Sequence, residues 1–183
     1  QIKYPFIPEF FGEVQDGSRE IFLFLFELLD ENEMDVFNSE NEPEKWTDEY
    51  ILGAINSIHL LHKGFLNGWN KDELKFIPAF NPGLSLSFYE QSNKINQKDY
   101  VEWELDHLFQ DIADVIDFWK ITPPEKTSKQ TLVHNDFNSR NVGVRKNGEP
   151  CIYDWELAMI NIPQRDIFEF LAFTLDADYH PDR

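Results

Sequence analysis

Two apolar runs rich in phenylalanine lie near the start of the chain, at residues 9–14 and 19–29. The short link between them contains the pair Asp16-Gly17, which is a hairpin turn signal. We therefore predict a two-stranded antiparallel unit. Because the stretch 21–29 lacks alternating polar residues, we expect its strand to be buried on both faces.

Two segments lack a regular apolar pattern. Residues 30–44 contain seven acidic residues among fifteen, and we interpret them as a solvated connection. Residues 64–98 are irregular as well, with Asn81-Pro82-Gly83 as a clear turn.

Two other segments have the periodicity of amphipathic helices. In the first, Thr47 can cap a helix that runs to about Lys63, with Gly64 at its stop. One face of this helix holds Ile51, Ile55, Ile58 and His62. The second helix is expected at residues 99–120 and begins with a capping box variant at Asp99. Its apolar stripe consists of Val101, Leu105, Leu108, Ile112, Val115, Ile116 and Trp119.

The first helix carries two histidines, His59 and His62, three positions apart. A helical zinc site uses histidines four positions apart, which places both on one face. We therefore interpret these two as core residues and not as metal ligands.

Short apolar strands alternate with polar loops in the last third of the chain. Strands are predicted at residues 131–133, 142–145 and 151–153, with a turn at Asn147-Gly148 between the last two. A helix is expected at residues 167–175.

Polar residues are densest in the loop 134–141, and Asp154-Trp155-Glu156 follows the third strand directly. A hairpin between the last two strands would bring Asn141 close to Asp154. One carboxylate and one amide oxygen suit Mg²⁺, which proteins bind through one or two carboxylates together with substrate phosphates. Asp136, held in the same loop, would face this metal as a base.

Composition restricts the class of protein. The chain has 183 residues, of which 42% are apolar and 15% aromatic; this suits one domain or one large lobe and excludes wholesale disorder. With 16 Lys and Arg against 34 Asp and Glu, the formal net charge is −18. Because acids outnumber bases twofold, we expect no nucleic acid and no anionic membrane surface as partner.

Two further features bear on the compartment. No apolar run reaches the length of about 18 residues that crosses a bilayer, so no membrane association is expected. Cys151 is the single cysteine, which excludes an intramolecular disulfide and makes a reducing cytoplasm the expected location.

The polar loop and the triplet after it form one motif. His134-x-Asp136, with Asn141 five residues after the aspartate and Asp154-Trp155-Glu156 further on, resembles the catalytic segment of the aminoglycoside phosphotransferase and choline kinase families. These families share the protein-kinase-like fold. Asp-Trp-Glu in place of Asp-Phe-Gly is similar to the small-molecule kinases, and His-Asn-Asp is similar to choline and ethanolamine kinases.

The resemblance implies a role for each matched residue. Asp136 would accept the proton of the substrate hydroxyl or orient that hydroxyl, and Asn141 and Asp154 would hold Mg²⁺. His134 would shape the loop, and Asp166, at the start of a family helix, would have a structural role beside it.

The implied fold is α+β and protein-kinase-like. A mainly helical C-terminal lobe, with a small β-hairpin carrying the catalytic loop, would follow a remnant β-hairpin of the N-terminal lobe. Residues 1–29 would then be the last strands of the small lobe and the hinge, and residues 30–183 a C-terminal lobe that is incomplete at its C-terminus. ATP is the implied co-substrate, and its adenine would meet the hinge backbone at Phe26, Glu27 and Leu28.

Three parts of a complete kinase are not found in the sequence: a glycine-rich phosphate loop, a strand lysine and the helix glutamate that pairs with it. The resemblance therefore implies that the missing N-terminal part of the same polypeptide is a partner of this chain. It also implies that the isolated fragment is inactive.

The implied function is transfer of the γ-phosphoryl group of ATP to a hydroxyl of a small molecule. We expect a cationic acceptor, because the chain is acidic and tryptophans 46, 69, 103, 119 and 155 offer ring faces for cation–π contacts. The alternative is a degenerate kinase-like lobe that acts as a non-catalytic binding or scaffolding module. The joint presence of Asp136, Asn141 and Asp154 favours the enzyme.

Overall fold

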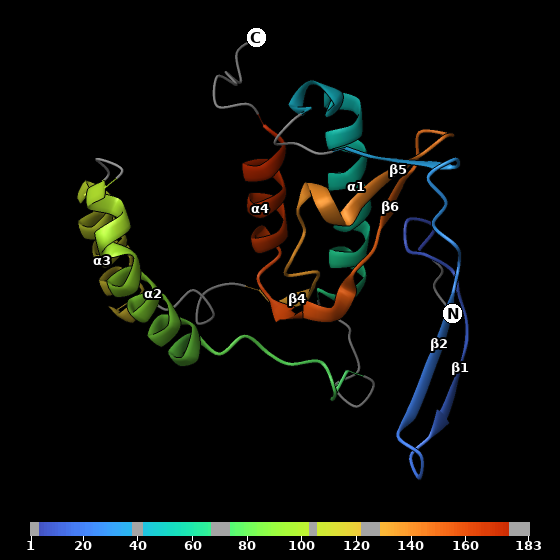
Figure 1. The fold of residues 1–183 in the computed structure, drawn as a ribbon, viewed down its shortest axis with the longest axis horizontal. Coiled ribbons are helices and arrows are strands. Elements are labelled where there is room, and N and C mark those ends of the chain that lie inside the picture. The colour runs from blue at the N-terminus through green and yellow to red at the C-terminus, as the bar shows by residue number, and fades with distance from the viewer. Residues whose placement is uncertain (1–3, 38–41, 67–73, 103–105, 122–128, 176–183) are drawn as a thin grey trace.

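The computed structural model describes residues 4–37, 42–66, 74–102, 106–121 and 129–175. Figure 1 shows three parts: a β-hairpin, a mixed core of short strands and helices, and a pair of long helices beside that core. Within the described residues, no helix is both long and apolar enough to cross a membrane.

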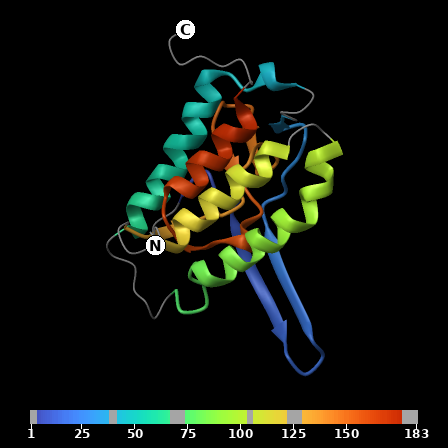
Figure 2. The same ribbon diagram turned by 90° about the vertical axis from the view of Figure 1, so that its left-hand side faces the viewer.

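Strands β1 (Phe10–Asp16) and β2 (Ile21–Phe26) form the predicted antiparallel hairpin, with Asp16 opposite Ile21 at the turn. The predicted burial of β2 is wrong, because every residue of this strand is exposed. The hairpin extends away from the core (Figures 1 and 2). The unbroken hydrophobicity of β2 therefore reflects two apolar faces that the described part of the chain leaves uncovered.

The acidic segment 30–44 contains a short strand, β3 (Met34–Val36), which pairs with β5 (Val142–Arg145). Its interpretation as a purely solvated connection is therefore wrong. Met34 is buried and lies directly against Gly143, where a larger residue would collide with its thioether. Only Met34 of this strand is buried, while Asp35 and Val36 are exposed, so the acidic neighbours of Met34 can stay in contact with water.

Helix α1 (Asp48–Phe65) has the predicted cap and the predicted inward face. Thr47 accepts a hydrogen bond from the backbone N–H of Tyr50 at 3.4 Å. Three predicted face residues are buried, namely Ile51, Ile58 and His62. The helix continues through Gly64, so this glycine is not its stop.

The second helix of the core, α4 (Gln164–Thr174), includes most of the predicted segment 167–175. Aromatic rings fill the space between α4 and the polar loop. Phe137 stacks on Phe170 with ring centroids 4.6 Å apart, and Trp46 meets Phe170 edge-on at 5.2 Å. These contacts anchor the loop that carries the motif to the centre of the core.

Helices α2 (Pro82–Glu102) and α3 (Asp106–Ile121) form the pair beside the core. The prediction of one helix starting at Asp99 is therefore wrong, since Asp99 lies inside α2. The predicted irregular segment 64–98 is wrong over residues 82–98, whereas residues 74–81 are irregular and residues 67–73 lie outside the described residues. Proline suits the first turn of a helix, because its missing N–H would have no partner there, so Asn81-Pro82-Gly83 opens α2 instead of making an isolated turn.

The predicted stripe of the second helix is only partly inward. Ile116 is buried, whereas Val101 and Val115 are exposed. Leu105 and the side chains of Leu108 and Trp119 lie outside the described part of the structure. The stripe divides because its residues belong to two helices that pack against each other.

Candidate active site

Three short strands deliver the motif to one edge of the core. Strand β4 (Thr131–Val133) precedes the polar loop, β5 follows it, and β6 (Pro150–Ile152) returns antiparallel to β5 as predicted. Val142 lies opposite Ile152, so the next pair outward is Asn141 and Tyr153. The N–H of Tyr153 donates to the carbonyl of Asn141 at 3.1 Å, which brings the following residue, Asp154, beside the end of the loop.

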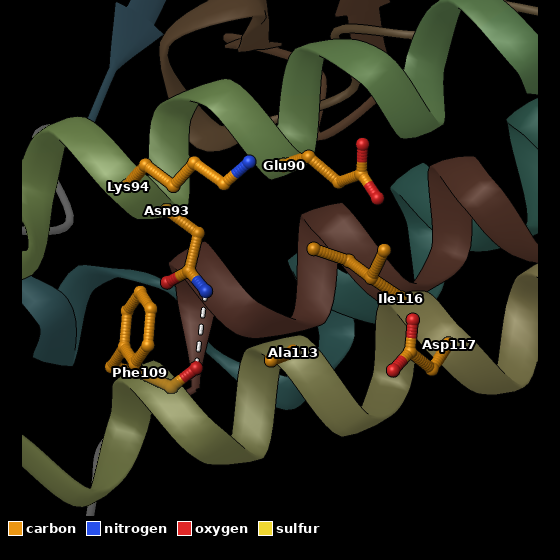
Figure 3. A pocket seen from close by; sticks show the side chains of 7 residues that line it. All are labelled: Glu90, Asn93, Lys94, Phe109, Ala113, Ile116 and Asp117. Carbon is orange, nitrogen blue, oxygen red and sulfur yellow. Dashed lines mark hydrogen bonds between the residues drawn. The ribbon is translucent and has the colours of Figure 1, made fainter.

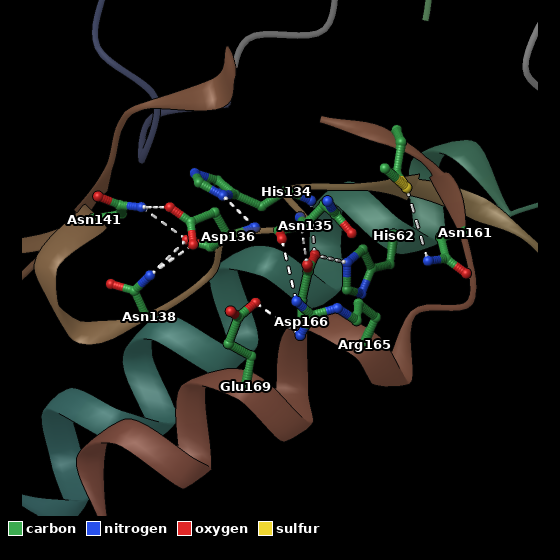
Figure 4. Close-up of polar contacts among 11 residues, drawn as sticks. His62, His134, Asn135, Asp136, Asn138, Asn141, Asn161, Arg165, Asp166 and Glu169 are labelled. Carbon is green, nitrogen blue, oxygen red and sulfur yellow. Dashed lines mark hydrogen bonds and ion pairs between the residues drawn. The ribbon is translucent and has the colours of Figure 1, made fainter. Parts of the chain in front are cut away.

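The carboxylate of Asp136 is held by two amide side chains (Figure 4). Asn138 Nδ2 donates to one oxygen at 2.9 Å, and Asn141 Nδ2 donates to the other at 2.7 Å. Both amides also contact the carbonyl of Asp136. The orientation of this side chain is therefore fixed before any substrate binds. The motif assigns no role to Asn138, so its contact with Asp136 was not predicted.

His134 is fully buried and connects the loop to the strand before Asp154. Its Nε2 lies 2.8 Å from the carbonyl of Tyr153, which can only accept, so this nitrogen carries the proton. Its Nδ1 accepts from the N–H of Asp136 at 3.3 Å. Burial lowers the pKa of His134, against the opposing effect of the Tyr153 carbonyl, which favours the neutral ring that these two bonds require.

Asp166 is fully buried in the first turn of α4 and receives three donors. One oxygen accepts the N–H of His134 at 2.9 Å and lies 2.8 Å from His62 Nε2, while the other accepts the N–H of Asn135 at 2.8 Å. Figure 4 shows these groups converging from α1, α4 and the loop. The burial of His62 was predictable from its helix face, but its partner, 104 residues away, was not.

Arg165 adds a further contact to the same loop. Its Nη2 donates to the carbonyl of Asn135 at 3.4 Å, and its Nη1 forms an ion pair with Glu169 at 2.9 Å. Asn135 has a left-handed backbone with φ of 66°, a conformation that asparagine adopts more readily than most residues. Bonds on both sides of its peptide hold this turn in place.

Asp154 lines a cavity of about 620 Å³ between the loop after β6 and the end of β2. Its backbone is left-handed, with φ of 63°, and its side chain is exposed. From the hairpin side, Phe26 and Glu27 line the cavity, but Leu28 does not belong to its wall. The N–H of Glu27 already donates to the carbonyl of Glu9 at 2.7 Å, so this predicted hinge donor is not available to a ligand.

The residues predicted to bind metal fit a hard cation. The amide nitrogen of Asn141 is occupied by Asp136, and Figure 4 shows its oxygen turned away from that carboxylate. Asp154 directly follows Tyr153, whose N–H bonds to the carbonyl of Asn141, and an amide oxygen and a carboxylate oxygen are donors that water and phosphate oxygens would complete around Mg²⁺. The described residues contain no group of three His, Cys, Asp or Glu side chains that could hold a metal by themselves.

A second, smaller cavity of about 120 Å³ lies between α2 and α3 (Figure 3). Asn93 reaches across it and donates to the carbonyl of Phe109 at 3.0 Å. Beside it, Lys120 bridges Glu90 and Asp117 with exposed ion pairs. None of the residues predicted for catalysis lines this cavity.

A family comparison gives the identity of the chain. The sequence model described as "Phosphotransferase enzyme family" matches residues 5–182, nearly the whole chain. The chain belongs to this family. No curated protein matches it in sequence.

Solved structures show the fold of this phosphotransferase family member. The GDP and kanamycin complex of an aminoglycoside phosphotransferase, APH(2")-IIIa, has a TM-score of 0.60 at 15% identity, over 93% of this chain and 56% of that one. A choline/ethanolamine kinase family protein from Mesorhizobium loti has a TM-score of 0.56 at 14% identity, over 94% and 51%. The streptomycin–ATP complex of APH(2")-IIa has a TM-score of 0.50 at 16% identity, over 87% and 51%.

These comparisons confirm the predicted family and the α+β, protein-kinase-like fold. The chain spans about half the length of the solved structures it matches.

Proposed function

We propose that this chain is part of an ATP-dependent phosphotransferase that transfers the γ-phosphoryl group to a hydroxyl of a small molecule. The observation that carries the proposal is the position of Asp136. Two amides fix its carboxylate, and one of them, Asn141, adjoins Asp154 at the edge of a cavity of about 620 Å³. A fixed base beside an oxygen-rich edge and a cavity is what phosphoryl transfer needs, because it relies on positioning and electrostatics.

In this proposal each residue of the motif has a separate task. Asp136 orients the acceptor hydroxyl and accepts its proton, since its two amide donors keep the carboxylate in one orientation. Asn141 and Asp154 would hold Mg²⁺, which when bound neutralises charge on the phosphates. His134 and Asp166 act as supports, because their hydrogen bonds join the loop to β6 and α4.

The larger cavity is the proposed nucleotide site. Its walls include the rings of Phe24, Phe26 and Trp155, which suit the flat face of a purine. The hinge would offer backbone groups from Phe26, Glu27 and Leu28, except for the N–H of Glu27 that is already bonded. Two of the similar structures were solved with GDP and with ATP, which supports a nucleotide co-substrate.

The acceptor is proposed to be a small cationic molecule. The exposed residue Asp154 lines the larger cavity, and the chain has a net charge of −18. Among the similar structures, two hold kanamycin or streptomycin. The described residues at the site thus favour a ligand with positive charge.

The domain division is part of the same proposal. Residues 1–29 would be the last strands of the small lobe and the hinge, and residues 30–183 the C-terminal lobe. The preceding part of the same polypeptide would supply the phosphate loop and the lysine, and the isolated chain would be inactive without it. Within the described residues β2 pairs only with β1, so its other edge is open to a further strand, and this supports the proposal.

The proposal is tested by Asp136→Asn in the full-length polypeptide. We expect kcat to fall by about 10²- to 10⁴-fold, because the amide can orient the hydroxyl but cannot accept its proton. The Kd of ATP should stay within about twofold, since Asp136 does not line the nucleotide cavity. Asp111→Asn, on the exposed side of α3, is the matched control.

Unchanged turnover in Asp136→Asn would remove this residue from the reaction. Absence of phosphoryl transfer in the wild-type protein, with a panel of amino alcohols, aminoglycosides and sugars, would favour the scaffolding module instead.

A further inference from the structure

A two-pronged ion pair joins the end of the hairpin to the sheet that carries the motif. Arg145 Nη1 lies 2.5 Å from one oxygen of Glu27, and its Nη2 lies 2.9 Å from the other. The two residues are 118 positions apart in the sequence. Paired, parallel bonds of this kind fix the orientation of both side chains as well as their distance.

Both partners are themselves anchored. Glu27 also accepts the N–H of Glu9 through its carboxylate at 3.1 Å, and its own N–H is bonded within the hairpin. Arg145 lies opposite Met34 in the β3–β5 ladder, and its Nη2 contacts the sulfur of Cys151 at 3.4 Å. The ion pair therefore connects two rigid pieces of backbone.

The ion pair is partly buried, with 22% of the Arg145 side chain and 28% of the Glu27 side chain exposed. Arg145 beside Glu27 holds the pKa of this carboxyl below its ordinary value, so that it is charged at neutral pH. A partly desolvated, two-pronged pair is less screened by salt than an exposed one.

The position of the pair relates it to the larger cavity. Glu27 lines that cavity from the hairpin side, and Asp154 lines it from the opposite side. Arg145 ends the same strand that begins directly after Asn141. The ion pair thus spans from the proposed hinge to the strand that holds the proposed metal ligand.

We propose that Glu27 and Arg145 are positioning residues that set the separation between the hinge and the catalytic sheet, and thereby the affinity for nucleotide. This inference rests on the proposed nucleotide site in the larger cavity. Phe6, buried in the core and bonded through its carbonyl to the N–H of Ile152 at 2.6 Å, anchors the start of the hairpin, whereas every residue of β2 is exposed. The ion pair fixes the other end of the hairpin, where β2 leads into the hinge, and so keeps the hinge at the distance that a base and its phosphates require.

The test uses the full-length polypeptide with three variants: Arg145→Met, Glu27→Gln and the exchanged pair Glu27→Arg/Arg145→Glu. We expect each single variant to raise the Kd of Mg-ADP and Mg-ATP about tenfold by calorimetry, with little change in the KM of the acceptor. The exchanged pair should recover most of the affinity, because it restores the ion pair with opposite polarity. Lys146→Met is the matched control. Lys146 follows Arg145 directly in the chain, and its substitution breaks an exposed ion pair with Asp35.

Three results would overturn the inference. The first is nucleotide affinity in both single variants equal to that of the wild type. The second is a parallel rise in nucleotide Kd and acceptor KM, which would indicate general loosening of the protein. The third is a lower Tm in the single variants with no change in their nucleotide Kd. If the wild type binds no nucleotide, the proposed function fails as well, so the two failures are distinguished by the wild-type titration.

Discussion

The hairpin and the loop 134–141 have burial opposite to what their compositions suggest. Strand β2 consists of apolar residues only, yet all of them are exposed. The loop after β4 is polar, yet His134, Asn138, Ser139 and Asn141 are buried. Burial in this molecule is thus decided by the partners available to a segment and not by its hydrophobicity.

Hydrogen bonding explains why the polar loop can be buried. Asp166 satisfies two backbone donors of the loop, and the amides of Asn138 and Asn141 are used by Asp136. A buried polar group whose bonds are made costs little, whereas an unpaired one is expensive. The hairpin has the reverse problem, because its backbone is paired but its apolar side chains lack cover in the described structure.

The largest expected contrast in stability concerns two phenylalanines. Phe137→Ala should lower the free energy of unfolding by about 3–5 kcal/mol, because a fully buried ring stacked on Phe170 is lost. Phe22→Ala in the exposed strand should change it by about 0.5 kcal/mol or less. Urea unfolding of both variants measures the difference. Equal losses would mean that the hairpin is packed in solution.

For Asp166→Asn we expect a smaller loss in the free energy of unfolding, about 2 kcal/mol. Both oxygens of Asp166 accept backbone N–H groups, and the NH₂ group of an asparagine would place a donor against one of them. Amide hydrogen exchange at His134 and Asn135 should accelerate. Asp111→Asn serves again as the exposed control. Unchanged exchange at both amides would show that the loop is held by other contacts.

The polar loop should also make stability depend on pH. Burial lowers the pKa of His134, so the folded protein binds this proton less readily than the unfolded chain. The contribution is present above about pH 6.5 and is lost as the pH falls below that value toward the folded pKa. His134→Gln should flatten this part of the profile, measured by unfolding between pH 8 and pH 5. A profile that keeps its slope in the variant would assign the effect to another group.

The smallest energetic change is expected on the hairpin. The chain of 183 residues, produced by itself, should self-associate through β2, because exposed apolar strands attract one another. Leu23→Lys/Leu25→Lys places two charges on one face of β2. Light scattering should show a lower mass for this variant with stability changed by about 0.5 kcal/mol or less. Association that persists would place the contact elsewhere.

Sequence reasoning predicted best those elements that local signals define. The turn at Asp16-Gly17, the cap at Thr47 and the strands around residues 134–141 are all encoded by near neighbours. The family motif located the candidate site for the same reason, since its spacing is local.

The features that were missed depend on distant partners. Strand β3 forms because β5, more than a hundred residues later, offers it an edge. Helix α2 has no clear apolar stripe, so its pattern does not separate it from a loop. The pairs His62–Asp166 and Glu27–Arg145 are separated by 104 and 118 residues, and the local sequence around one partner does not predict the other.

The single thiol of the chain, at Cys151, allows local opening around β6 to be measured as a rate. Cys151 lies fully buried in β6 opposite Gly143, and burial raises the pKa of its thiol. Because the thiolate is the reactive species, a thiol reagent can modify Cys151 when the packing over its sulfur, which includes Arg145, opens. The labelling rate therefore reports how often the contacts around Arg145 and β6 open, without any introduced probe.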